Sequence, residues 1–426
     1  MASRGEVFQP TFDDLPHDLL LEHLIPRLGV SDRVTLSRVN RRTQALVVAH
    51  GNAPLRPRTS DFLNSVERLC WAREHGCRWD VWISTEAAKG QLAVLKWARE
   101  HDPPCPWDAS TCQSAASGGH LDVLKWMRQQ DPPCSWDALT CAHAALGGHL
   151  DLLKWAREQD PPCSWDRRVC AAAADRGHLG LLKWARAQDP PCSWNVMTCA
   201  FAAKGGHLDA LEWMRGQHPP CPWDHTACAY AAEEGHLDVL KWMRQQDPPC
   251  PWDSSTCARA AQEGHLAVLQ WAREQAPSCP WNASTSDCAA SGGHLEVLRW
   301  LRQQDPPCRW DALTCAHAAK GGHLEVLEWL RERDPACPWD GDTCACAAEA
   351  GNLELLKWAR MTDPPCPWGE DSCAAAARGG HLEVLQWLRE QHPPCPWDWD
   401  VVCEVATERK HLEIIKWAQV QEPRPQ

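Results

Sequence analysis

Cysteine and histidine recur along this chain at a spacing that could hold a metal ion. Cys105, Cys112 and His120 give the pattern Cys-x6-Cys-x7-His, and most of the following 29-residue segments repeat it. Thiolates and imidazoles are zinc ligands. Some copies, however, replace the histidine or the second cysteine by residues that are poor zinc ligands. These residues are Gln91 and Asn352 at the histidine position, and Ile83, Ser286 and Val402 at the cysteine position.

The substitutions predict buried thiols that behave as small apolar side chains, and histidines that hydrogen-bond the backbone at a turn. No metal and no cofactor is expected. A zinc protein or a redox-active thiol protein stays open as an alternative.

Tryptophan is the second regular series. The chain has 27 tryptophans, and 23 of them occupy two positions of the repeat, beginning with Trp97 and Trp107. A regular aromatic series could stack on bases or sugars. One series, however, lies within an apolar helical stripe, and the other follows a proline where it can cover the next repeat. We therefore predict that both series belong to the core.

No arrangement typical of an enzyme occurs. The sequence contains no GxSxG, GxxxxGK[ST] or HExxH motif and no glycine-rich phosphate loop after a strand. The protein is therefore predicted not to be an enzyme.

All these positions belong to one repeat, of which Leu121–His149 is an example. With Leu92 as position 1, eleven copies run to His411, and a half copy, Val66–Gln91, precedes them. Positions 1, 3, 4, 6 and 7 are apolar, which predicts a helix that packs on both sides and ends at an Asp-Pro-Pro sequence. Position 17 holds Asp, Asn or Gly, which are N-cap residues, so a second helix is expected to begin there and to end at glycine.

The segment AAxxGHLEVLKWL in these copies resembles the ankyrin repeat. The resemblance implies an all-α, ankyrin-like solenoid of stacked helix-turn-helix repeats with short connectors and no extended β-sheet. Two features depart from the family. Thr-Cys-Ala, as at Thr140–Ala142, replaces Thr-Pro-Leu-His, and the period is about four residues shorter than the usual 33.

Residues 12–50 differ from the array. Leu15, Pro16, Leu19 and Leu20 fit the opening LPxxLL, and residues 39–42 with Leu46 fit the second part, so the segment resembles the F-box. The resemblance implies docking onto the Skp-type adaptor of a cullin–RING ubiquitin ligase through a helix-in-groove contact. Three features depart from the family. One extra residue lies between Leu15 and Leu28, Pro26 lies near the end of the first helix, and Thr43 replaces the usual tryptophan. The residues predicted to dock are Leu15, Pro16, Leu19, Leu20, Leu24 and Leu28. The alternative is a helical cap on the first repeat.

Composition sets the remaining expectations. The chain is 44% hydrophobic and 23% charged with a formal net charge of −13, and no apolar run approaches 18 residues. We therefore predict no membrane partner, no nucleic-acid partner, and a cytoplasmic or nuclear location with reduced thiols. The predicted organisation is a disordered tail at 1–11, the F-box-like segment at 12–50, a linker at 51–65, the array at 66–418 and a solvated tail at 419–426.

Function in a repeat array is expected where the copies differ, because the framework positions are fixed by packing. Positions 19, 23 and 26 vary most, and their spacing places them on one exposed stripe of the helix. By the ankyrin resemblance this stripe lines the concave surface. The predicted partner-binding residues are His143, Met197, Phe201, Lys204, Tyr230, Glu233, Arg259, Gln262, His317 and Lys320.

These features together predict a non-catalytic interaction protein. We expect the substrate-recognition subunit of a Skp–cullin–F-box ubiquitin ligase, with an unknown protein client on the concave face of the array. The alternative is an ankyrin-type scaffold with no ubiquitin role.

Overall fold

The computed structural model describes residues 63–74 and 79–421, and all their regular structure is helical. These ranges contain 25 α-helices and no strand, so the predicted all-α solenoid with short connectors is confirmed. The F-box-like segment, with its six predicted docking residues, lies outside the described residues.

The chain divides into two compact units, Met1–Val169 and Cys170–Gln426. The described helices of the first unit are α4 (Val66–Glu74), α5 (Val81–Ala87), α6 (Leu92–Glu100), α7 (Ala109–Ser117), α8 (Leu121–Arg128), α9 (Ala138–Leu146) and α10 (Leu150–Glu158). Helix α11 (Arg167–Asp175) contains the boundary.

The second unit continues the alternation of two helices per repeat. Its helices are α12 (Leu179–Arg186), α13 (Val196–Lys204), α14 (Leu208–Arg215), α15 (His225–Glu233), α16 (Leu237–Gln245), α17 (Ser254–Gln262), α18 (Leu266–Glu274), α19 (Ala283–Ser291), α20 (Leu295–Gln303), α21 (Ala312–Gly321), α22 (Leu324–Arg331), α23 (Gly341–Glu349), α24 (Leu353–Met361), α25 (Glu370–Gly379), α26 (Leu382–Glu390), α27 (Trp399–Glu408) and α28 (Leu412–Gln421).

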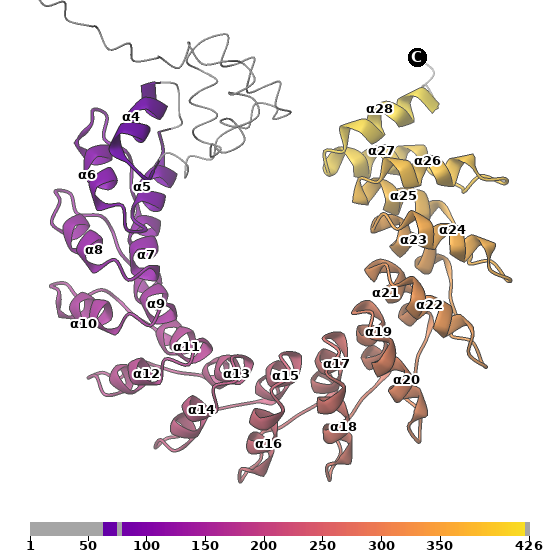
Figure 1. Cartoon of the computed structure of the whole chain (residues 1–426), viewed down its shortest axis with the longest axis horizontal. Helices are drawn as coiled ribbons and strands as arrows, with labels where there is room; N and C mark the ends of the chain where they lie inside the picture. The colour runs from indigo at the N-terminus through magenta and orange to yellow at the C-terminus, as the bar shows by residue number, and fades with distance from the viewer. Residues whose placement is uncertain (1–62, 75–78, 422–426) are drawn as a thin grey trace, which may run out of the picture. The chain divides into compact units, whose positions relative to one another are not determined.

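Within the second unit the helices form two rows (Figure 1). The odd-numbered helices α13 to α27 stack side by side on the inner side of the unit's curve, and the connectors project from the other side. Each odd-numbered helix packs mainly on the next odd-numbered one, as α21 does on α23. A repeat therefore contacts its neighbours and little else, as in other solenoids.

The odd-numbered helices begin where the sequence predicts, directly after position 17. Before α9, Asp137 is extended and its side chain accepts from the Thr140 backbone nitrogen at 3.1 Å, while the Asp137 nitrogen donates to Thr140 Oγ1 at 3.2 Å. This reciprocal pair is a capping box built on Asp and Thr. It satisfies backbone donors that the first turn of the helix would otherwise leave unpaired.

The predicted glycine stop is also present. Gly148 follows α9 with a φ of 74°, in the left-handed region where a side chain is strained. The His149 nitrogen then donates to the Ala144 carbonyl at 2.9 Å, closing the helix end. The chain leaves this turn directly into the next helix, α10.

The even-numbered helices bury a narrower face than the apolar pattern predicts. In α8, Val123, Leu124 and Met127 are fully buried, whereas Leu121 and Trp126 are half-buried. The helix also ends at Arg128, before the Asp-Pro sequence. Positions 3, 4 and 7 therefore form the core of this row, with positions 1 and 6 at its edge.

The tryptophans of the two series are half-buried rather than core residues, contrary to the prediction, except Trp329, which is buried. Trp107 and Trp126 are both half-buried and meet edge-to-face, with ring centroids 5.9 Å apart. The Arg99 guanidinium lies over the Trp107 ring at 4.1 Å. The connector series lies outside the helix rows, and the other series lies at the edge of the even-numbered helices. Each tryptophan therefore covers the edge of a repeat. The same pairing repeats through the described array.

The described helices are all short. None of them combines the length and the apolar composition needed to cross a lipid bilayer.

Candidate functional site: the inner stripe of the odd-numbered helices

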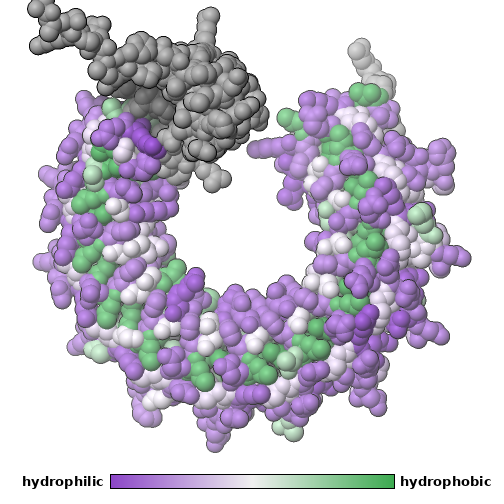
Figure 2. Space-filling view, viewed as in Figure 1, coloured by the Kyte–Doolittle hydropathy of each residue, from purple (hydrophilic) through white to green (hydrophobic). Residues whose placement is uncertain are grey.

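The inner stripe consists of positions 19, 23 and 26 on the odd-numbered helices. In α21 the framework residues Cys315, Ala318 and Ala319 are fully buried, while Leu313 is 50% exposed. His317 is half-buried and Lys320 is exposed. Small buried framework residues bring adjacent helices close, which aligns the stripe positions of consecutive repeats. Figure 2 shows, for the second unit, hydrophilic residues along this inner edge and apolar ones between the helix rows.

The structure gathers five of the predicted residues into what we call the aromatic cluster: Phe201, Lys204, Tyr230, Glu233 and Arg259. The Phe201 and Tyr230 rings lie 6.2 Å apart and tilted by 33°. Lys204 Nζ and the Arg259 guanidinium approach the Tyr230 ring at 5.5 and 5.0 Å. Both rings are half-buried rather than exposed.

The charges of the aromatic cluster pair with one another. Lys204 Nζ donates to Glu233 Oε1 at 3.3 Å and lies 3.6 Å from Glu234, and Arg259 donates to the other Glu233 oxygen. The hydrogen bond with Glu233 raises the pKa of Lys204 above its ordinary value. A partner at this point must therefore displace an existing network of ion pairs.

Of the other predicted residues, Met197 and Gln262 lie about one turn from Phe201 and Arg259 on the same helices. Met197 is half-buried in the first turn of α13, and Gln262 is exposed at the end of α17. His143 belongs to α9 in the first unit, where it is half-buried. His317 and Lys320 lie on α21, where they line a second feature of the stripe.

That feature is a hollow of about 330 Å³, the inner hollow, on three consecutive odd-numbered helices. Small side chains form its floor, and charged side chains lie at its edges. It is lined by Leu313, Ala316, His317 and Lys320 of α21, by Asp342, Ala345, Cys346 and Glu349 of α23, and by Asp371, Ala375 and Arg378 of α25.

Only two of these eleven residues, His317 and Lys320, are among the predicted binding residues. Seven of the other nine occupy the same positions 19, 23 and 26, so the positional signal was present. What the sequence did not reveal is the depth of the surface. Cys346 and Ala375 at position 23 leave space that larger residues fill at the same position of other repeats, as Phe201 and Tyr230 do.

The polar groups of the inner hollow are arranged in two rows. Asp342 and Asp371 lie in the first turns of α23 and α25, where negative charge complements the helix N-terminus. Lys320, Glu349 and Arg378 lie at the other ends, and Arg378 approaches Glu349 at 3.9 Å. A partner therefore meets an acidic row, an apolar floor and a row of mixed charge.

One hydrogen bond and burial set the states of two lining side chains. His317 Nδ1 donates to the Leu313 carbonyl at 2.8 Å, which places the proton of the neutral ring on Nδ1. Burial raises the pKa of the Cys346 thiol, so it remains protonated at neutral pH. The inner hollow is suited to binding rather than to nucleophilic chemistry.

The cysteine and histidine series serves the framework. Cys134 Sγ donates to the Asp108 carbonyl at 3.2 Å, and His149 Nε2 contacts the Ser117 carbonyl at 3.1 Å, both across a repeat boundary. A hydrogen bond with Cys134, together with burial, raises the pKa of the Cys112 thiol. In the part of the chain that the structure describes, no three His, Cys, Asp or Glu residues are grouped so that they could hold a metal ion.

With this geometry established, the chain can be compared with known proteins. Residues 286–331 match the family model of ankyrin repeats in many copies. The matched stretch runs from α19 to α22, so the resemblance seen in the sequence extends to the helical pairs there. Ankyrin-type solenoids are typically interaction scaffolds without catalytic activity. The comparison with curated proteins gives no match.

Two solved structures of similar architecture are of the pentatricopeptide repeat protein PPR10 in complex with an 18-nt psaJ RNA element, one of them with three cysteine substitutions. Each is 13% identical, with a TM-score of 0.35, and covers 92% of this chain and 68% of that chain. At this TM-score the likeness gives no argument for a ligand of this chain.

One prediction is corrected, because net charge alone does not exclude a nucleic-acid partner. The net charge of −13 was taken to exclude a nucleic-acid partner, yet the helical repeat protein in both structures holds RNA. Net charge sums over the whole chain, whereas a solenoid can place basic side chains on one face and acidic ones on another. The exclusion is therefore wrong.

Proposed function

We propose that the chain is a non-catalytic interaction protein that holds a segment of a protein partner on the inner stripe, with an apolar side chain of that partner in the inner hollow. The observation that carries the proposal is the inner hollow itself. Three consecutive repeats contribute a floor of alanine and cysteine side chains between charged rows.

The size of the hollow supports a side-chain anchor. A volume of about 330 Å³ lies at the lower end of the range for ligand pockets. Interfaces gain most of their affinity where one large apolar or aromatic group fills such a hollow and charged groups form the rim. Leu313, one of the lining residues, is 50% exposed and adds apolar surface at the edge of the inner hollow.

The aromatic cluster is the second candidate for the centre of the site. Aromatic rings with arginine are the residues that carry binding energy in many interfaces. Phe201 and Tyr230 supply the rings, but their cationic neighbours are already paired with Glu233. We therefore rank the aromatic cluster below the inner hollow.

One experiment separates these two sites. The full chain, Ala345→Trp and the double variant Phe201→Ala with Tyr230→Ala are used as baits in a lysate, and retained proteins are quantified by mass spectrometry. Ala345→Trp fills the inner hollow from a half-buried position and is expected to lose the partner, while the double variant keeps it. Lys183→Glu, on an exposed position of α12, is the control that retains the partner.

The opposite pattern would move the centre of the site to the aromatic cluster. Retention of the same partner by all variants would end the proposal for the inner stripe. Each variant's circular dichroism and thermal unfolding must match the parent chain for the comparison to count.

The finer prediction, a subunit of a Skp–cullin–F-box ubiquitin ligase, rests on the resemblance of residues 12–50 alone. Its test is co-purification of the full chain with the Skp adaptor. The double variant Leu20→Asp with Leu24→Asp is expected to abolish that association, because charge on the apolar stripe prevents a helix-in-groove contact. Unchanged association would favour the scaffold alternative or another docking surface.

A further inference from the structure

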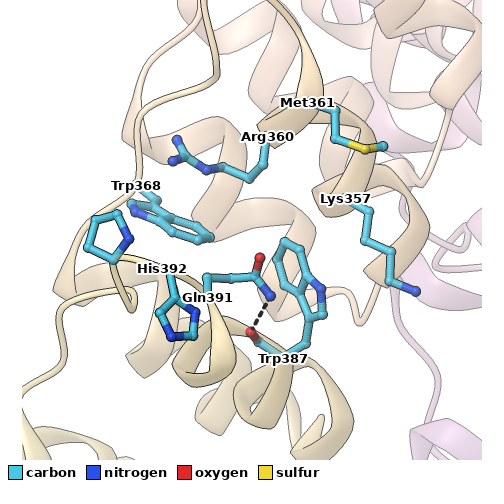
Figure 3. A pocket seen from close by; sticks show the side chains of 8 residues that line it. Lys357, Arg360, Met361, Trp368, Trp387, Gln391 and His392 are labelled. Atoms are coloured by element: carbon cyan, nitrogen blue, oxygen red, sulfur yellow. Dashed lines mark hydrogen bonds between the residues drawn. The ribbon is translucent and has the colours of Figure 1, made fainter.

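A second hollow lies on the connector side of the second unit, away from the inner stripe. This connector pocket has a volume of about 420 Å³ and is formed by the ends of α24 and α26 and the connectors that follow them (Figure 3). It is lined by Lys357, Arg360, Met361, Trp368, Trp387, Gln391, His392 and Pro393.

The floor of the connector pocket is rigid. Trp368 and Trp387 meet edge-to-face with centroids 6.0 Å apart, and the Arg360 guanidinium lies over Trp368 at 4.0 Å. Gln391 Nε2 donates to the Trp387 carbonyl at 3.0 Å, the bond drawn in Figure 3. These contacts fix the two indoles and the guanidinium without a ligand, so little order has to be gained on binding.

Two departures from the repeat occur at this place. Met361 stands at position 9, where eight of the eleven copies have Glu or Gln, and it is 80% exposed. His392 stands at position 11, where eight copies have Asp. The first change adds exposed apolar surface, and the second removes a carboxylate. Framework packing requires neither change, because both side chains are exposed.

The charge of the lining selects an anion. Lys357 and Arg360 contribute positive charge, and the lining contains no carboxylate. Lys357 Nζ pairs with Glu354 at 2.7 Å, but Glu354 is 82% exposed, and such a surface pair contributes little. Lys357 can therefore turn to a ligand at small cost.

The same contacts exclude a cationic ligand, which a pair of indole rings would otherwise favour. Tryptophan rings bind cations over their faces. Here Arg360 already covers Trp368, and a second cation would be repelled by Arg360 and Lys357. The remaining combination is an anionic group on a flat apolar body.

We propose that the connector pocket binds an aromatic carboxylic acid, its ring against Met361 and Trp387 and its carboxylate held by Lys357 and Arg360. A guanidinium has five donors, and Arg360 uses Nη1 for the Cys366 carbonyl, so it can serve the framework and the ligand together. The ligand is either a free aromatic acid or the aromatic C-terminal residue of a peptide, since both present the same groups.

Isothermal titration of the full chain with three indoles tests the charge assignment. Indole-3-acetate, indole-3-acetamide and tryptamine share one ring and differ in charge. Binding is expected to weaken about tenfold from the acid to the neutral amide, because a charge-assisted hydrogen bond is replaced by neutral ones. Tryptamine is expected not to bind. Equal binding of acid and amide, or no binding of the acid, would overturn the proposal.

Variants then locate the site. Lys357→Glu and Met361→Glu are both expected to abolish binding of indole-3-acetate, and Met361→Glu restores a residue that five other copies carry, so the fold should tolerate it. Lys241→Glu, at the matching exposed position of α16, should leave binding unchanged. Binding that survives both pocket variants, or is lost in Lys241→Glu as well, would contradict the assignment.

A final titration distinguishes the two sources. The peptide Gly-Gly-Gly-Trp is compared as its free acid and its C-terminal amide. Tighter binding of the free-acid peptide than of indole-3-acetate identifies a peptide C-terminus, whereas tighter binding of indole-3-acetate identifies a free acid. Either order, with the peptide amide about tenfold weaker than the peptide acid, supports the proposal. Equal binding of the peptide acid and amide contradicts it.

Discussion

His207, at the end of one repeat, reaches back to the carbonyl oxygen of Asp175 in the preceding repeat, with Nε2 and the oxygen 3.1 Å apart. The ring packs against Gly177, where an added Cβ would lie 2.5 Å from Nδ1. His265 makes the equivalent contact to the Glu233 carbonyl at 2.9 Å, and His323 to that of Ser291 at 2.9 Å. The histidine series thus connects adjacent repeats through the backbone.

This contact predicts how substitutions of His207 rank. His207→Ala should destabilise the chain by about 1–2 kcal/mol, because the Asp175 carbonyl loses its donor. His207→Asn should cost less than about half of that, since Asn352 at the same position still donates across the repeat boundary. Its Nδ2 bonds the Ala319 carbonyl at 2.9 Å, one residue before the position equivalent to Asp175. Urea unfolding followed by circular dichroism measures both. Equal losses for the two variants would show that ring packing, not the hydrogen bond, matters.

Much of the fold follows from the 29-residue period. Asp137 and Thr140 identify a helix start, and Gly148 identifies a helix end, because caps depend on local chemistry. The partner of a histidine such as His207 is less accessible to sequence reasoning, since it lies 32 residues away. The repetition of histidine indicates a structural role, but it does not indicate which carbonyl oxygen the ring contacts.

The candidate site was predictable in position and not in shape. Variation among copies marked positions 19, 23 and 26, and the structure places those positions together on one stripe. The inner hollow depends on how much volume the side chain at position 23 occupies, where Cys346 and Ala375 are smaller than Phe201 and Tyr230. The connector pocket arises from two departures, Met361 among them, that look incidental in the sequence.

The tryptophan pairs predict a modest cost for each indole. Trp242 is half-buried and meets Trp223 edge-to-face at 6.1 Å, whereas Leu240 is fully buried. Trp242→Ala should therefore cost about 1–3 kcal/mol. Leu240→Ala should cost more, within the range of about 2–5 kcal/mol that is typical of a buried leucine. A double-mutant cycle between Trp223 and Trp242 should give a coupling of about 0.5–1.5 kcal/mol.

The measurement for this pair is again the urea midpoint, with Leu240→Ala as the comparison. If Trp242→Ala costs more than Leu240→Ala, the indoles belong to the core after all, as the sequence had suggested.

Lys410 is the one non-glycine residue with positive φ among the described residues, at 62°. Ten other copies have glycine at this position. A non-glycine residue in the left-handed region costs about 1–2 kcal/mol. Glycine avoids this strain, but part of the gain is lost because glycine has more conformational freedom in the unfolded chain. Lys410→Gly should therefore stabilise the helix pair α27–α28 by about 0.5–1 kcal/mol. Slower amide hydrogen exchange in α28 is the expected readout, with Lys410→Ala as a control that gives no gain.

Asp287 is the exception in the framework of α19. It occupies position 22, where eight copies have alanine, and is only 8% exposed. Thr314 Oγ1 donates to its Oδ1 at 2.6 Å, yet burial raises the pKa of this carboxyl above its ordinary value. The buried carboxylate accepts a hydrogen bond from one hydroxyl, and none of the ion pairs among the described residues involves it. The desolvation cost therefore exceeds what the hydrogen bond returns.

The sign of the pH dependence follows from this shift. An acid whose pKa is raised on folding binds more protons in the folded state, so stability falls as pH rises from the unfolded pKa, about 3.9, through the folded one. Above both values the cost is constant. Removing the charge should therefore stabilise the chain by about 1 kcal/mol at pH 7, and by little below pH ~4.

Asp287→Ala and Asp287→Asn test this together. Alanine restores the residue that the other repeats carry, and Thr314 Oγ1 keeps its bond from the Asp311 nitrogen at 3.2 Å. Asparagine keeps an acceptor for Thr314 without the charge. Thermal unfolding at pH 7 and at pH 4 should show a gain for both variants only at the higher pH. A loss at pH 7 in both variants would mean that the carboxylate form is stabilising, and that a cation the structure does not place beside Asp287 compensates its burial.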